Sequence, residues 1–352
     1  MRGVNLGGWF SQVDAIEEKD PSGFMDTVTH IQSFLGPADF SRVKGWGFDH
    51  VRLPLDWHIA FDRSMRPKEE ILRLLDASVE GILGEGLDLI LDLHKCPGHD
   101  FFDGTVRDQA FFVDSGHRRD CLRVWDHLAE RYGSRPGIML ELLNEPVAPS
   151  AEVWNEVKDQ LAAEVRRMAP RAKLVIGSNL WNSASQFEGL EPFDDDNVMY
   201  SVHVYNPILF THQRAPWCLG AAFSQSRSYP GTYTIADDGA SRLPLDEAGP
   251  WDRDRLRRLL EPVLSFRERF SAQVVCTEFG VYMGGPDRDS RNNWIRDILR
   301  VLDERDIGWS YWNYKNLDFG IMSVGESLFE AAPQYDNPDR VDRELLKILV
   351  AG

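Results

Sequence analysis

Two glutamates stand where short apolar segments of the chain end. Glu145 closes the segment IMLELLNEP, and Glu278 follows the apolar residues 274–276 in QVVCTEFG. Strands of a parallel sheet that are buried on both faces are continuous apolar segments, and the chemistry of such folds lies just past their carboxyl ends. Pro146 cannot continue a strand ladder, so it predicts a turn that leaves Glu145 at the rim. One such segment would be ordinary turn chemistry, but two carboxylates at two strand ends form a pair.

A pair of carboxylic acids without a metal-binding pattern suits the hydrolysis of a glycosidic bond. This reaction passes through an oxocarbenium-like transition state and needs one protonated and one ionised carboxyl group. Further polar and aromatic residues stand at or just after the ends of the predicted strands: Arg52, His94, Asn144, His203, Tyr205 and Trp312. Each has an ordinary structural explanation by itself, but together they would converge at one end of one sheet.

Several of these neighbours have predicted roles. Arg52 would hold one of the two carboxylates ionised, and the hydroxyl group of Tyr205 would donate a hydrogen bond to it. The amide of Asn144 suits a sugar hydroxyl, and Trp312 offers a flat face for a pyranose ring. Glu141, four residues before the first glutamate, faces the same side of its strand because side chains alternate. We expect Glu141 to form a structural ion pair with an arginine or a histidine.

The elements that must position these residues alternate between strands and helices. Eight short apolar segments are candidate strands, at about 3–6, 48–53, 87–93, 138–143, 173–176, 198–202, 273–276 and 307–311. Amphipathic segments lie between them, at 68–85, 118–131, 152–168, 252–270 and 291–304, and a last one covers 340–349. This alternation is typical of a parallel sheet with crossover helices, and eight strands close a barrel. We therefore predict an α/β fold of the (β/α)8 TIM-barrel class.

One connection is much longer than the others. About fifty residues between His203 and Trp251 separate the sixth strand from the next helix, and they are rich in Pro, Gly, Ser and aromatic residues. Long insertions in compact domains are commonly lids or small subdomains with a function. We predict that residues 1–352 form one catalytic domain, with an insertion at about 206–251 whose Trp217 forms part of a wall over the site.

Composition narrows the class of partner. The chain has 352 residues, a length that one α/β barrel commonly occupies, and a formal net charge of −17. Nucleic acids and anionic membranes both require a basic face, so we expect neither as a partner. A neutral substrate is compatible with this charge, and we expect a monomer.

Cysteine spacing and hydropathy further narrow the class of protein. Cys96, Cys121, Cys218 and Cys276 include no CxxC pair, so neither a zinc site nor a disulfide framework is predicted. No secretory leader precedes Gly3 and no run of about 18 apolar residues occurs, so we expect a soluble protein. The compartment stays open, because a leader that had been removed would leave the same sequence.

Seven segments carry a wider resemblance: RGVNLGGWFSQ, FDHVRLPLDW, LDLHKCPG, ELLNEPV, YNPILFTHQRAPW, CTEFGV and WNYKNLDFGI. With the residues above, they resemble glycoside hydrolase family 5, the cellulase family, and in particular its compact bacterial endoglucanases of C type. The resemblance implies a (β/α)8 barrel, a retaining mechanism and no cofactor. It also implies Glu145 as the acid/base, Glu278 as the nucleophile and the other six residues as their support. Lys95 and His99 depart from the pattern, because relatives tend to have His and Tyr there.

The favoured interpretation is a retaining endo-β-glucanase, in which the two carboxyl groups lie about 5 to 5.5 Å apart. We expect flanking sugar subsites among Asn5, Trp9, Phe101, Trp181 and Trp217. Cleavage of β-1,4-glucan, mixed β-1,3-1,4-glucan, mannan and, by an exo mode, β-1,3-glucan all stay open.

Two other classes of function compete with this interpretation. A metal-dependent barrel hydrolase would draw on His94, His99 and His203, but such sites usually contain an HxH pair, and HVY at 203–205 offers one imidazole. A glycan-binding protein without catalysis would not need both glutamates.

Overall fold

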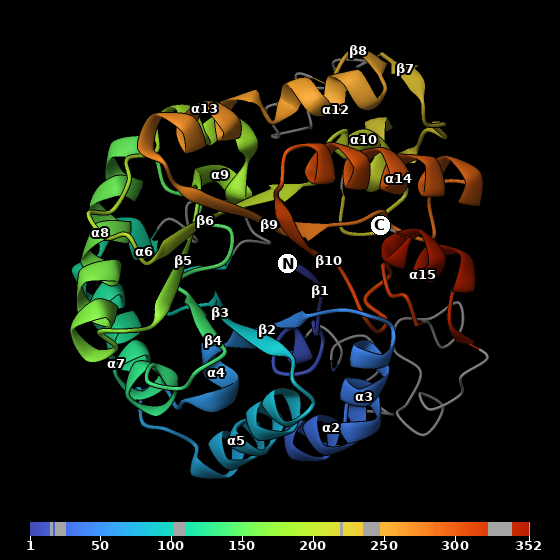
Figure 1. Ribbon diagram of the computed structural model, residues 1–352. Coiled ribbons are helices and arrows are strands. Elements are labelled where there is room, and N and C mark those ends of the chain that lie inside the picture. The colour runs from blue at the N-terminus through green and yellow to red at the C-terminus, as the bar shows by residue number, and fades with distance from the viewer. Residues whose placement is uncertain are drawn as a thin grey trace.

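The fold is a closed barrel of eight parallel strands surrounded by helices (Figure 1). The computed structural model describes residues 1–14, 17, 26–100, 110–218, 221–234, 247–322 and 340–351. In barrel order the strands are β1 (Arg2–Asn5), β10 (Gly308–Tyr311), β9 (Gln273–Phe279), β6 (Val198–Val204), β5 (Lys173–Gly177), β4 (Ile138–Glu141), β3 (Asp88–Lys95) and β2 (His50–Asp56). The predicted (β/α)8 barrel is confirmed.

Helices between successive strands form the outer ring. They are α2 (Thr27–Phe34), α3 (Pro37–Gly45), α4 (Trp57–Ala60), α5 (Glu69–Gly84), α6 (Ala110–Val113), α7 (Ser115–Tyr132), α8 (Ala151–Met168), α9 (Asn179–Asn182), α12 (Arg253–Leu259), α13 (Glu261–Phe270), α14 (Arg288–Glu304) and α15 (Arg343–Val350), with a 3-10 turn at Ala184–Glu188. Six begin at a side chain that caps the first turn: Asp26, Asp114, Ser150, Asp252, Asp287 and Asp342. None of the helices in the described ranges is long and apolar enough to span a membrane.

Several predicted boundaries differ from the structure. The single helix expected over 252–270 is two helices, α12 and α13, because Pro262 in the first turn of α13 cannot donate a bond within a continuous helix. Strand β4 ends at Glu141, short of the predicted 143, so the residues that follow it form a loop. Strand β9 runs on to Phe279, past the predicted 276.

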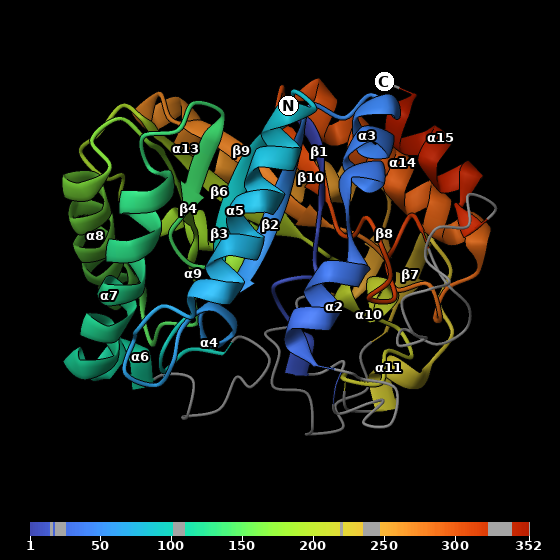
Figure 2. The same cartoon turned by 90° about the horizontal axis from the view of Figure 1, so that it is seen from below.

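The insertion after β6 contains two short helices, α10 (Ile208–Thr211) and α11 (Ala221–Ser224). It also contains the antiparallel pair β7 (Gly231–Tyr233) and β8 (Gly249–Trp251). Figure 2 shows α10 and α11 at the same end of the barrel as α4 and α6, with both chain termini at the other end. The buried carboxylate of Glu247 joins the end of the insertion to its start, because it accepts hydrogen bonds from the backbone of Ile208 and, at 2.9 Å, of Leu209. That the whole chain forms one catalytic domain stays a prediction.

Side chains fill the barrel in layers. The deepest layer is apolar and consists of Ile90, Met139, Val175, Met199 and Val275. Two residues further along their strands come polar side chains with no exposed surface: Asp92, Glu141, Ser201 and Thr277. The period of two along a strand places these polar groups inside the barrel above the apolar layer. The carboxyl ends of the strands therefore open onto a polar interior that is closed from below.

Candidate active site

Arg52 is the central cation of the site, and none of its surface is exposed. Its Nε and Nη2 atoms donate to the two oxygens of Glu141, at 2.6 and 3.1 Å. Its Nη1 atom donates to Oε1 of Glu278 at 2.6 Å and to Oδ1 of Asn5 at 3.0 Å, while Nη2 lies 2.9 Å from Oδ2 of Asp92. Burial alone would lower the pKa of Arg52, but attraction by three carboxylates raises it well above its usual value. The ion pair expected for Glu141 is confirmed.

Glu278 enters the barrel through an irregularity in β9. Val202 of β6 pairs with Cys276, but the next residue, His203, pairs with Glu278, so Thr277 is one residue too many for the register. A bulge of this kind changes which side chains face each side of a sheet. As a result, Thr277 and Glu278 both bond to groups inside the barrel, although they are neighbours in sequence.

The carboxylate of Glu278 receives two donors. Arg52 donates to Oε1, and the hydroxyl group of Tyr205 donates to Oε2 at 2.9 Å. Both contacts were expected from the sequence, and both are confirmed. The expected place of Glu278 just past a strand was wrong, because it lies within the bulged end of β9.

Glu145 approaches the same space from the loop after β4. Its backbone is left-handed, with φ of 45°, a conformation that costs a non-glycine residue about 1 kcal/mol or more. Its Oε1 atom lies 2.9 Å from Nδ1 of His203, and 12% of its side chain is exposed. Burial raises the pKa of Glu145 to about 7, although Arg52 opposes the shift. Glu145 can therefore carry a proton near neutral pH.

The two glutamates and His203 form one compact group. One atom from each, two carboxylate oxygens and a ring nitrogen, lie within 4.8 Å of one another. Burial lowers the pKa of His203 to about 4, so its imidazole is neutral at pH 7. The positive charge beside the pair comes from Arg52. His94 and His99 do not join this group in the described part of the chain, so the three histidines do not form a common ligand set.

His94, Asn144 and Trp312 line the neighbouring space. His94 Nδ1 lies 2.7 Å from Oδ2 of Asp92, and burial lowers the pKa of His94 to about 4. The His94 ring is parallel to Trp312, at 5.7 Å between centroids and 5° between planes. Asn144 accepts from Arg52 at 2.8 Å through Oδ1, and its buried Nδ2 has no hydrogen-bond partner in the described structure. Asn144 thus has a donor to offer a ligand.

The residues predicted for flanking subsites lie in different surroundings. Asn5 is fully buried below the site, where its Nδ2 donates to a backbone carbonyl of β9 at 2.9 Å. Trp9 is also buried, and its Nε1 atom donates to a carbonyl of α2 at 2.8 Å. Trp181 is half-buried, whereas Trp217 is 37% exposed. Phe101 lies outside the described residues.

Asp92 is the site residue that the sequence analysis missed. It precedes His94 by two positions on β3, so strand alternation was a signal that could have found it. Burial raises the pKa of Asp92 to about 7, against the attraction of Arg52. Two residues in this region depart from the sequence pattern of the family. Lys95 pairs with Asp100 at 2.8 Å, and His99 lies 3.1 Å from the backbone oxygen of Glu145.

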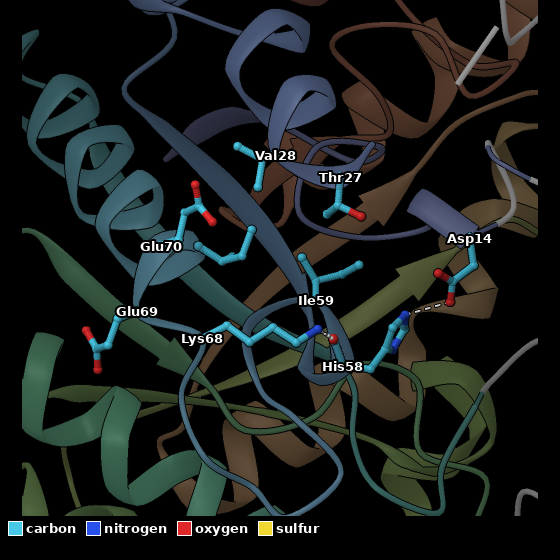
Figure 3. Close-up of a pocket in the computed structure, with 9 residues that line it drawn as sticks. Asp14, Thr27, Val28, His58, Ile59, Lys68, Glu69 and Glu70 are labelled. Atoms are coloured by element: carbon cyan, nitrogen blue, oxygen red, sulfur yellow. Dashed lines mark hydrogen bonds and ion pairs between the residues drawn. The ribbon is translucent and has the colours of Figure 1, made fainter. Parts of the chain in front are cut away.

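A cavity of about 510 Å³ lies apart from these residues, beside α2, α4 and α5 (Figure 3). His58 and Asp14 form an ion pair in its wall at 2.6 Å, and Lys68 Nζ donates to the backbone oxygen of His58 at 2.7 Å. The remaining lining residues are Thr27, Val28, Ile59, Glu69, Glu70 and Ile71. None of the residues predicted for catalysis or sugar binding lines this cavity.

The family model described as Cellulase (glycosyl hydrolase family 5) matches residues 16–318 of the chain. The chain belongs to glycosyl hydrolase family 5. It is therefore a glycoside hydrolase, and the resemblance seen in the sequence motifs is confirmed.

Two relatives support this assignment, and a solved structure shares the fold. Endoglucanase C of Acetivibrio thermocellus is 34% identical over 331 residues, which cover 91% of this chain and 93% of that protein. Cellodextrinase A of Ruminococcus flavefaciens is 30% identical over 310 residues, 87% of this chain and 83% of that protein. The crystal structure of endoglucanase Cel5A from Thermotoga maritima superposes with a TM-score of 0.75 at 23% identity, covering 99% of this chain and 96% of that chain. The last comparison shows the shared barrel fold.

The raised pKa of Asp92 predicts how stability depends on pH. The folded protein holds a proton on Asp92 that the unfolded chain releases near pH 4, so the stabilisation is complete below pH 4 and is lost as pH rises through about 7. Asp92→Asn should remove this dependence. Relative to wild type, the variant should gain roughly 1–3 kcal/mol in unfolding free energy between pH 5 and pH 8. Urea denaturation at both pH values measures the change, and a constant difference between the proteins would contradict the prediction.

Proposed function

We propose that this glycoside hydrolase is a retaining endo-β-glucanase that cleaves β-1,4-glucosidic bonds by double displacement. The observation that carries the proposal is the approach of Glu145 and Glu278 to within 4.8 Å in unequal surroundings. Retaining enzymes keep their carboxyl groups about 5–5.5 Å apart, whereas inverting enzymes leave about 6.5–9.5 Å for a water molecule. The short separation supports direct attack on the sugar.

In the first step, Glu145 gives its proton to the leaving oxygen while Glu278 attacks the anomeric carbon. The bonds from Arg52 and Tyr205 favour the ionised form of Glu278, as a nucleophile requires. Burial raises the pKa of Glu145 to about 7, so a large fraction of it carries a proton at neutral pH, as an acid requires. In the second step, Glu145 takes a proton from water, which then releases the sugar from Glu278.

The remaining residues would bind the sugar at the cleavage point. The free Nδ2 donor of Asn144 suits a hydroxyl group of the reacting ring, and Trp312 would offer its face for stacking. Asn5 has its amide committed to Arg52 and to the backbone, so we assign it a supporting role below the sugar. The proposal requires no cofactor.

The choice of β-1,4-glucan is supported by relatives. Endoglucanase C and Cellodextrinase A, at 34% and 30% identity over most of this chain, have names that refer to a glucan and to cellodextrins. We infer a similar substrate here, with mixed β-1,3-1,4-glucan as a second one. A monomeric protein without a nucleic acid or membrane partner remains our expectation from the composition.

The substrate and the stereochemistry are tested together. We expect release of mixed-length oligosaccharides from soluble β-1,4-glucan and mixed-linkage glucan, with less from mannan and β-1,3-glucan, and full activity after chelator treatment. Proton NMR of the first product formed should show the β-anomer, because two displacements restore the starting configuration. An initial α-anomer would contradict the retaining mechanism. Activity lost to chelator and restored by a divalent cation would instead favour a metal-dependent hydrolase.

The assignment of Glu145 as acid/base predicts a dependence on the leaving group. Glu145→Gln keeps the size of the side chain but cannot donate an acidic proton. The loss of kcat/KM, which reports formation of the glycosyl-enzyme, should be about 10²–10⁴-fold for a poor leaving group and small for an activated aryl glycoside. The basic limb of the wild-type rate profile, near pH 7, should disappear. Glu278→Gln is the control, since it should abolish hydrolysis of both substrates equally.

Trp217 is the residue of the insertion that we propose as a wall of the cleft. It is the one aromatic among the exposed large hydrophobic residues of the described chain. Its ring packs against Tyr282 at 5.3 Å and against His212 and Phe319 at 6.3 Å. His212 and Phe319 in turn contact Tyr205, which binds the nucleophile. An aromatic surface thus extends from Glu278 to the exposed face of Trp217.

Loss of this wall should affect long substrates most. Binding energy from remote sugars helps to organise the reacting one, so Trp217→Ala should lower kcat/KM on polymeric glucan by about tenfold or more, with little change on a short aryl glycoside. Trp217→Phe should retain much of the polymer activity, because it keeps a flat face. Phe270→Ala, at the far end of the barrel, controls for general loss of aromatic packing. Equal losses on both substrates would mean that Trp217 packs within the protein only.

A further inference from the structure

A chain of buried hydrogen bonds leads away from the acid/base on the side opposite the substrate space. From Glu145 it passes through His203 Nδ1, at 2.9 Å, and from His203 Nε2 to Thr277 Oγ1, at 3.0 Å. The Thr277 hydroxyl contacts that of Ser201, which accepts from Nδ2 of Asn182 at 3.0 Å. Asn182, Ser201 and Thr277 have no exposed surface, so water cannot replace any of these partners.

The Asn182 amide directs Nδ2 at Ser201 and leaves its buried Oδ1 without a hydrogen-bond partner in the described structure, and this orientation gives the bonds of the chain a direction. Because Asn182 donates to Ser201, the Ser201 hydroxyl hydrogen is available for Thr277. Among the partners of Thr277 Oγ1 in the described part of the chain, this leaves Nε2 of His203 to accept the Thr277 hydrogen. A neutral imidazole has one N–H, so that hydrogen is placed on Nδ1, facing Oε1 of Glu145.

The backbone around Asn182 is built to hold it there. Leu180, Trp181 and Asn182 are three consecutive residues with φ between 47° and 59°, in the left-handed region. Such strain persists only where surrounding contacts enforce it, and it gathers at functional sites. Gly177 leaves the room that Asn182 occupies, since a Cβ atom there would lie 2.3 Å from its Oδ1.

The same segment is fastened to the loop that carries Glu145. The side chain of Asn179 accepts from the backbone nitrogen of Ala148 at 2.8 Å and donates to its oxygen at 3.1 Å. The backbone nitrogen of Trp181 donates to the oxygen of Pro146 at 3.2 Å. The segment that holds Asn182 and the loop that holds Glu145 are thus bonded to each other, so the two ends of the hydrogen-bond chain are held together.

We propose that Asn182, Ser201 and Thr277 are positioning residues that fix the tautomer of His203 and so confine the acidic proton of Glu145 to Oε2. With Nδ1–H directed at Oε1, that oxygen can only accept, so the proton must occupy the other oxygen, where it can reach a leaving group. If the tautomer reversed, Nδ1 would accept a proton from Oε1 and hold it away from the substrate. The inference rests on the proposed role of Glu145 as acid/base.

The groups that face Glu145 and His203 must stay unchanged in any test of this chain. They are Arg52 from β2, Asp92 and His94 from β3, His99 from the following loop, Glu141 from β4, Tyr205 after β6 and Glu278 from β9. None of them is a member of the chain beyond His203. Thr277→Val is therefore the chosen change, because it removes one hydroxyl and keeps the shape and charge of the site. Thr277→Ser is the matched control that restores the hydroxyl.

The tautomer can be observed without activity. Nitrogen-15 NMR of wild type at pH 7 should show a protonated Nδ1 and an unprotonated Nε2 for His203. Thr277→Ser should retain this pattern, and Thr277→Val should lose it. A protonated Nε2 in the wild type would overturn the proposal. The expected pattern in a protein that hydrolyses no glucan would leave the chain in place and refute the proposed function instead.

Kinetics then connect the tautomer with the acid. In Thr277→Val, kcat/KM should fall about three- to tenfold for a poor leaving group, the range expected for one hydrogen bond, and less for an activated aryl glycoside. The basic limb of its rate profile should move to higher pH, since the donor that favours ionised Glu145 is no longer enforced. Ser201→Ala, one bond further away, should act in the same direction more weakly and serves if Thr277→Val does not fold. Equal losses on both substrates with an unmoved basic limb would show that the chain only packs the barrel.

Discussion

A buried guanidinium group holds the site together. Arg52 bonds to Asn5, Glu141, Asn144 and Glu278 and forms an ion pair with Asp92. Three of these partners are carboxylates, and burying even one without a partner costs several kcal/mol. A single planar cation with its N–H groups directed outward satisfies all of them because its geometry matches several acceptors at once. Without it, the polar layer of the barrel would not be compatible with a closed interior.

The position of Arg52 follows from the strand register. Arg52 pairs with Asn5 on β1 and with Ile90 of the apolar layer on β3, so its long side chain starts beside that layer. From there the Arg52 side chain reaches Glu141 at the carboxyl end of β4 and Glu278 at the carboxyl end of β9. The apolar layer excludes water from below, which strengthens every charge interaction above it. The same exclusion of water raises the pKa values of Asp92 and Glu145 and lowers those of His94 and His203.

The sequence predicts the barrel and most members of the site because both follow simple periodicities. Apolar segments mark the strands, and polar residues at their ends mark the site. For this reason the sequence correctly predicted that Arg52, Tyr205 and Glu278 lie together. The local departures from periodicity were not predictable. The bulge at Thr277 depends on how β9 pairs with β6, and the left-handed backbone at Glu145 depends on the loop that receives it. Ser201 lies two residues before His203, so alternation places it inside, but nothing in the sequence shows that a loop amide completes its bonds.

The two glutamates differ because the chain delivers them differently. Glu278 sits on a strand, 5% exposed, where the bulge turns it directly toward Arg52 and Tyr205. Glu145 sits on a loop, where its side chain receives a neutral imidazole rather than a cation. A full charge stabilises a carboxylate more than a neutral donor does, and at Glu145, which has the neutral donor, burial dominates and raises the pKa. The different roles of the acid and the nucleophile therefore follow from strand and loop geometry. Any change that brought Glu145 into contact with Arg52 would remove this difference.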